Sequence, residues 1–221
     1  MSPQQTIESE SSPVQSFMDW IQANSRIVGF GAAIVVVAAI GYWFYLRSGE
    51  IKRTNAERQL NQAKQSLSAG NPALAQTDLQ RVATRYKGTP AGSQAALLLA
   101  QLEYSQGRYA EGLKVLEEYG SRSAAGPNFA SVLALTGDGQ LSQAKAAEAA
   151  ESYQKAAEET SLPGEKAFYR AKAGRALMAA GKNDEARTLW EKLATDPEAL
   201  PVRSEAEVRL GELSARAAGR S

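Results

Sequence analysis

Two pairs of neighbouring carboxylates, Glu117-Glu118 and Glu158-Glu159, are the side chains of this sequence that come nearest to acid–base chemistry. Neighbours on a helix point in different directions, so both pairs are expected on solvated faces. The chain contains no cysteine and no histidine, which removes the thiolate nucleophile, the commonest general base and the commonest transition-metal ligand. Gly137-Asp138-Gly139 lacks the lysine and serine or threonine of a phosphate-binding loop. We therefore predict that the protein is not an enzyme and holds no cofactor or metal.

Residues that could bind a protein segment recur instead at a step of 37 residues. They stand three, six and ten positions before Gly70, Gly107, Ala144 and Gly181. On the first helices of a repeat stack they would form an apolar groove with a mixed-charge edge, which suits an extended or helical hydrophobic segment of a partner. The alternative is that the apolar members only pack between neighbouring helices. The candidate groove residues are Leu60, Lys64, Leu67, Leu97, Gln101, Tyr104, Leu141, Arg175 and Met178.

The elements that position these residues follow from the same step. A fixed period of about 20–50 residues is typical of a repeat architecture. One column of positions holds small residues and another holds large ones, which are expected to meet where two helices of a pair cross. The small column is Ala63, Ala100, Gly137 and Gly174, with a fifth copy at Gly211, and the large column is Leu79, Leu116, Tyr153 and Trp190.

Each repeat is expected to be two helices joined by a tight turn. Glycine at the turn suits a left-handed helix end, and proline near the start of a first helix suits a position that needs no backbone donor. The predicted fold class is all-α, a solenoid of about four helix pairs closed by a capping helix at 202–217. The predicted pairs are 53–69 with 72–86, 91–106 with 108–119, 128–143 with 145–159, and 165–180 with 182–195.

An uncharged run of 20 residues, Ile27 to Leu46, predicts a single transmembrane helix. At about 1.5 Å per residue it would span roughly the 30 Å of a bilayer core. Tyr42-Trp43-Phe44-Tyr45 gather at one end, as aromatic residues do at a membrane interface. A buried core helix is one alternative, although a slender repeat stack offers no such core. A cleaved signal peptide is the other, but the leader is long and acidic.

The predicted domains are a tail at 1–26, the transmembrane helix at 27–46 and the repeat domain at 47–221. Residues 1–12 are polar and are expected to be disordered. Val14, Phe17, Met18 and Ile21 follow at helical spacing, and we predict a helix in the membrane interface, with an ordinary solvated leader as the alternative.

Charge favours one orientation of the anchor. Its N-terminal side carries Arg26, whereas its other side carries Arg47, Lys52, Arg53 and Arg58. The positive-inside rule alone therefore places the repeat domain in the cytoplasm, although long domains can translocate regardless of charge. The whole chain has 25 basic and 24 acidic residues, which gives no reason to expect nucleic acid as a partner.

The columns resemble the tetratricopeptide repeat, whose consensus has two small residues, then a large aromatic or aliphatic one, then a small or apolar one, and then a proline. The clearest copy is Gly174, Ala186, Trp190, Leu193 and Pro197. The usual unit has about 34 residues, so the extra length here is expected in the connections. Some members of that superfamily grip a terminal carboxylate with basic and amide side chains in the groove. Leucine and alanine replace most of those residues here, so we do not expect that binding mode.

The layout of the chain also resembles one bacterial family, the YfgM-like ancillary subunits of the Sec translocon. The similarity covers nearly the whole chain and lies in Phe17, Asn24, Arg26, Gly29 and Tyr42-Trp43, and in Gly174 through Ala186 and Trp190. It implies a single-pass inner-membrane protein with a periplasmic repeat domain. It also implies protein partners, namely translocon subunits, periplasmic chaperones or secreted clients, and contact with membrane lipid through the anchor. The alternative is a structural scaffold or assembly protein that uses the same repeats and faces the cytoplasm.

Overall fold

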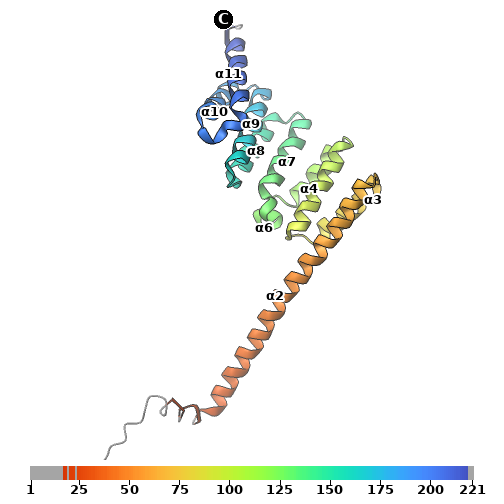
Figure 1. The fold of residues 1–221 in the computed structure, drawn as a ribbon, viewed down its shortest axis with the longest axis vertical. Helices are drawn as coiled ribbons and strands as arrows, with labels where there is room; N and C mark the ends of the chain where they lie inside the picture. The colour runs from red at the N-terminus through yellow and green to blue at the C-terminus, as the bar shows by residue number, and fades with distance from the viewer. Residues whose placement is uncertain (1–16, 19, 23, 219–221) are drawn as a thin grey trace, which may run out of the picture. The chain divides into compact units, whose positions relative to one another are not determined.

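The computed structural model describes residues 17–218 except 19 and 23, and all regular elements in that part are helices. The chain divides into two compact units, residues 1–51 and 52–221, which we describe in turn (Figure 1). The predicted disorder of residues 1–12 and the first residues of the predicted interfacial helix lie outside the described part.

The first unit contains the apolar run of the sequence. Residues 17, 18 and 20–22 are helical, and a turn at Asn24 precedes helix α2 (Ser25–Ser68). The backbone and side-chain nitrogens of Asn24 both donate to the Trp20 carbonyl oxygen, at 3.0 Å each. From residue 34 to 44 the side chains of α2 are exposed. Among the described residues, one helical stretch, Ile34–Ser68, is long and apolar enough to cross a membrane.

The second unit is a stack of helix pairs in chain order (Figure 1). The predicted four pairs and capping helix are confirmed, with boundaries within about two residues except at the start of the first pair, where α2 continues without a break. The pairs are α2 after residue 52 with α3 (Pro72–Arg85), α4 (Pro90–Ser105) with α5 (Tyr109–Glu117), α7 (Phe129–Ser142) with α8 (Ala146–Glu159), and α9 (Pro163–Ala179) with α10 (Asn183–Thr195); α11 (Arg203–Ala218) follows as the capping helix.

Short helical segments fill the longer connections between pairs. Helix α6 (Arg122–Ala125) and the 3₁₀ turn η1 (Gly126–Asn128) join α5 to α7, and η2 (Pro197–Val202) joins α10 to α11. Pro90 and Pro163 open α4 and α9, as predicted from their missing N–H group. Pro127 and Pro201 instead lie in the 3₁₀ turns that precede α7 and α11.

The turn inside each pair has a left-handed residue at the predicted position. Gly70, Gly107 and Gly181 have φ values of 71°, 76° and 76°, and Ala144 has φ 61° in the equivalent place. Ala144 is the one non-glycine residue of the described part with a positive φ. At all four turns the next residue donates its N–H to a carbonyl five residues back, at 2.9–3.1 Å. These bonds make each turn a Schellman motif, which satisfies carbonyl groups at the end of the first helix.

The small and large columns meet between the helices of a pair, as predicted. A Cβ built at Gly137 would approach the Tyr153 ring to 2.7 Å, and one built at Gly174 would approach the Trp190 ring to 2.6 Å. Both rings are almost completely buried. A larger residue in the small column would therefore separate the two helices, so the column fixes how closely the backbones approach.

Candidate protein-binding surfaces of the repeat stack

The nine predicted groove residues all lie on the first helices of the pairs, but they differ in exposure. Leu60 is 2% exposed and belongs to the core. Gln101 and Leu141 are exposed. The remaining six are half-buried, namely Lys64, Leu67, Leu97, Tyr104, Arg175 and Met178. The surface that a partner could touch is therefore more polar than the column pattern alone predicts, and the role of these residues in binding stays a prediction.

A pocket of about 430 Å³ brings together two of the predicted residues, Leu60 and Lys64. It lies between α2, the start of α4 and the η1 connection. The amide of Asn128 donates to the Pro90 carbonyl oxygen at 3.3 Å and to the Ser93 hydroxyl at 2.8 Å, which holds the connection against α4. The other lining residues, which sequence reasoning missed, are Glu57, Asn61, Pro90, Ala91, Gln94, Pro127 and Asn128.

A second pocket, of about 300 Å³, brings together the predicted Arg175 and Met178 with residues of α11. Arg175 donates to Glu205 at 3.1 Å, and Arg209 donates to Glu212 at 3.0 Å. The hydrogen bond to Glu212 raises the pKa of the Arg209 guanidinium above its ordinary value. Arg216 also lines the pocket, so its lining holds three guanidiniums and one carboxylate, Glu212, and carries a net positive charge.

Tyr104 is held within the stack rather than on a free surface. Its hydroxyl donates to the Leu135 carbonyl oxygen at 3.3 Å, and its ring lies 5.6 Å from the Tyr109 ring. A Cβ at Gly112 or Gly139 would overlap Tyr104, so these two glycines make room for it. Burial, together with the Asp138 carboxylate, raises the pKa of the phenol. At this position the structure favours packing between helices over contact with a partner.

A charged cluster around Asp138, which stands six positions before Ala144, joins the third and fourth pairs. Lys172 Nζ lies 2.6 and 2.9 Å from the two carboxylate oxygens of Asp138, and the Tyr153 hydroxyl donates to the same carboxylate at 2.5 Å. The ammonium group also lies 5.2 Å from the centre of the Tyr153 ring. Burial and the hydrogen bond to Asp138 raise the pKa of Tyr153. Asp138 is therefore used to hold helices α7, α8 and α9 together.

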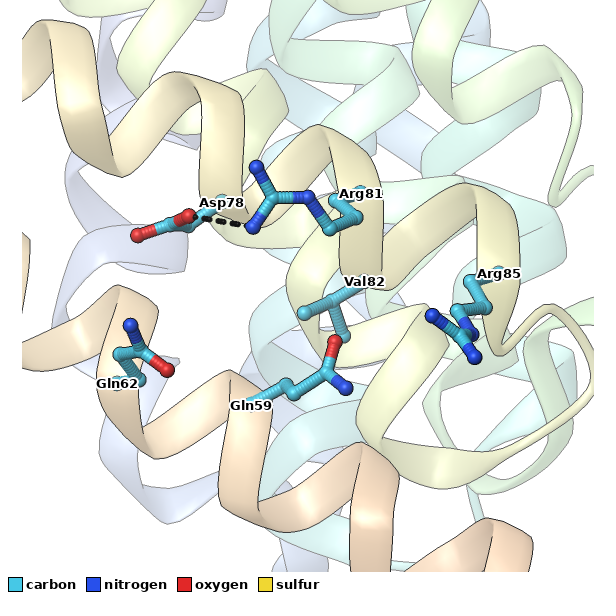
Figure 2. A pocket seen from close by; sticks show the side chains of 6 residues that line it. All are labelled: Gln59, Gln62, Asp78, Arg81, Val82 and Arg85. Carbon is cyan, nitrogen blue, oxygen red and sulfur yellow. Dashed lines mark hydrogen bonds and ion pairs between the residues drawn. The ribbon is translucent and has the colours of Figure 1, made fainter.

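Two further pockets involve the second helices, where the sequence predicted no site. One, of about 320 Å³, lies between α2 and α3 and is lined by Gln59, Gln62, Asp78, Arg81, Val82 and Arg85 (Figure 2). In Figure 2 the Arg81 guanidinium points to Asp78, to which it donates at 3.1 Å. The other, of about 680 Å³, lies between α5, α7 and α8.

Two of the neighbouring carboxylates form ion pairs away from these pockets, and a third lines one of them. Glu118 lies 3.7 Å from Lys87, and Glu159 forms an ion pair with Arg122. Glu117 lines the pocket between α5 and α7. Among the described residues no group of three or more acidic side chains could hold a metal ion.

Comparison with known proteins agrees with this architecture. Residues 18–215 match the family model of a tetratricopeptide repeat-like domain. The chain belongs to this family. No curated protein matches the chain.

Two crystal structures of putative kinesin light chain nearly identical TPR-like repeats from Podosopora anserina are similar to the chain. One of them, the structure of a single-residue variant, has a TM-score of 0.55 at 18% identity, and the other has 0.54 at 17%. Each comparison covers 76% of this chain and 98% of the other. At these identities the similarity concerns the fold alone. Tetratricopeptide-like repeats typically serve as protein-interaction scaffolds, so the fold points to protein partners rather than to catalysis.

Proposed function

We propose that this protein is a membrane-tethered module that binds a segment of another protein along the first helices of its repeats. The observation that carries the proposal is the pair of pockets that contain predicted groove residues, one between α2 and α4 and one between α9 and α11. Both combine an apolar side chain with charged ones, as expected of a site for a peptide with mixed character. The exposed apolar part of α2 supplies the anchor.

Within that proposal, the partner is a translocon subunit, a periplasmic chaperone or a secreted client, and the repeat domain is periplasmic. This assignment is supported by the similarity to YfgM-like proteins in the anchor and the last repeat. A photo-crosslinking residue placed at Asn61 or Gln94, which line the first pocket, should form adducts with such proteins in cells. The matched control is Gln154, an exposed residue of α8. Adducts of equal yield at all three positions would refute binding in the groove.

A cytoplasm-facing scaffold is the second candidate, and the basic residues after the anchor favour it. Arg47, Lys52, Arg53 and Arg58 lie on that side, whereas Arg26 stands alone on the other. Protease treatment of spheroplasts that carry the protein with a tag after Ser221 separates the two candidates. Digestion of the tag in intact spheroplasts supports the periplasmic proposal. Survival of the tag until the membrane is broken supports the scaffold.

A further inference from the structure

On one face of the capping helix α11, Gly211 continues the small column that meets the second helix in each pair, and Val208 continues the column of Leu60 and Leu97. Gly211 stands one period after Gly174, and Val208 stands one period after Ala171. In α9, Gly174 is covered by the Trp190 ring and Ala171 is fully buried. In α11, nothing lies within 4 Å of a Cβ built at Gly211, and Val208 is 60% exposed. Its other face is occupied, because Ala206 and Leu213 are buried in the core.

The four helix pairs of the chain define what covers a face of this kind. In each pair the second helix presents a small residue and, four positions later, a large residue, and both are buried. These residues are Ala75 with Leu79, Gly112 with Leu116, Ala149 with Tyr153, and Ala186 with Trp190. The free face of α11 continues an interface that the chain already builds four times, so its natural occupant is a fifth helix of the same type.

We propose that α11 docks, across Gly211, an amphipathic helix of another protein that carries a small residue and an aromatic residue four positions apart. The aromatic ring occupies the space over Gly211 that Trp190 occupies over Gly174, and Val208 borders it. Glu207, beside this face, has no ion-pair partner among the described residues, and it favours a basic residue at the edge of the docked helix. A second copy of the chain has no such helix to offer within the described residues, because the large residues of its second helices are buried.

The site lies apart from the groove pocket between α2 and α4, and Val208 and Gly211 do not line the pocket between α9 and α11, so it is tested separately. The probe is a fluorescent, hydrocarbon-stapled peptide with the sequence of residues 182–196, because stapling limits the ordering cost of a short helix. Its binding to the detergent-solubilised full chain is measured by fluorescence anisotropy. The Gly211→Leu variant fills the site. Nothing lies within 4 Å of a Cβ at this position, and leucine favours a helix more than glycine does, so we expect the variant to fold. Ala217→Leu adds the same side chain at an exposed position of α11 away from Gly211 and serves as the control.

We expect the peptide to bind the wild-type chain and Ala217→Leu equally, and Gly211→Leu at least tenfold more weakly. A peptide with alanine in place of Trp190 should also bind at least tenfold more weakly. Absence of binding overturns the proposal. Equal binding to the wild-type chain and to Gly211→Leu also overturns it, because the peptide would then bind elsewhere, for example at the position that α10 occupies against α9. A wild-type dimer that Gly211→Leu converts to a monomer would also overturn it, because the face would then join two copies. Crosslinks at Asn61 and Gln94 are expected to be unchanged in Gly211→Leu, so the groove proposal can fail independently.

Discussion

Ala144 offers a direct test of whether the repeat turns are set by backbone conformation. Its φ of 61° is left-handed, and the other three turns have glycine in this place. An L-residue in the left-handed region costs about 1–2 kcal/mol, which glycine avoids. Glycine also gives the unfolded chain more freedom, which lowers stability by about 0.4–1 kcal/mol. The balance predicts that Ala144→Gly stabilises the protein by about 0.5–1 kcal/mol.

The same balance predicts the opposite sign for Gly107→Ala and Gly181→Ala, each a loss of about 0.5–1 kcal/mol. No side-chain packing interferes, because nothing lies within 4 Å of a Cβ at either glycine and Ala144 is exposed. Ala147, an exposed residue inside α8, is the control for Ala144. Ala147 is in the first turn of α8 and its φ is not positive. Glycine there relieves no left-handed strain and adds freedom to the unfolded chain, so Ala147→Gly should lower stability.

Thermal unfolding of the detergent-solubilised chain, followed by circular dichroism at the helix band, measures these effects. A change of about 1 kcal/mol corresponds to a shift of roughly 2–4 °C in Tm for a domain of this size. We expect Ala144→Gly to raise Tm and the other three variants to lower it. If Ala144→Gly lowers Tm as Ala147→Gly does, the left-handed backbone at position 144 does not govern the stability of the turn.

Three further predictions concern the packing between helices. Gly174→Leu forces a side chain against the Trp190 ring, which is 0% exposed. The variant should lower the free energy of unfolding by about 1–3 kcal/mol. A red shift of Trp190 fluorescence is the local readout. Burial raises the pKa of Tyr119 to about 12. Between about pH 10 and 12 the unfolded state therefore releases a proton that the folded state keeps. The free energy of unfolding should fall with rising pH in this window, and it should fall less steeply in Tyr119→Phe. Lys172→Met leaves Asp138 without its ammonium partner and should lower the free energy of unfolding by about 1 kcal/mol. Urea unfolding measures this loss, and the urea midpoint of the variant should depend less on salt concentration.

The period of the sequence was sufficient to predict the helix pairs, because turn and packing requirements act at fixed positions. Glycine is favoured where a helix ends in a left-handed residue, and a small residue is needed where a ring of the second helix lies against the first. Both requirements are local to one repeat. Gly70, Gly107 and Gly181 could therefore be placed at turns, and Gly137 and Gly174 at crossings, without knowledge of how one pair packs on the next.

The surfaces between pairs could not be predicted in the same way. Leu141 and Tyr104 occupy the same column, three positions before the turn, yet Leu141 is 38% exposed while Tyr104 is half-buried. Gly139, which has no counterpart in the column pattern, leaves room for the Tyr104 hydroxyl. Likewise, Pro127 and Asn128 line a pocket because η1 folds against α4. Such residues lie where the connections depart from the period.

The glycine of the capping helix is explained by docking better than by capping alone. A helix that only has to solvate the end of a stack gains nothing from glycine, which costs about 1 kcal/mol relative to alanine in a helix interior. At Gly137 and Gly174 that cost is offset by close packing of an aromatic ring. At Gly211 nothing in the described part of the chain offsets it, and the neighbouring Val208 exposes an apolar side chain where a cap would be polar. Both features become favourable once a helix with an aromatic residue lies across α11.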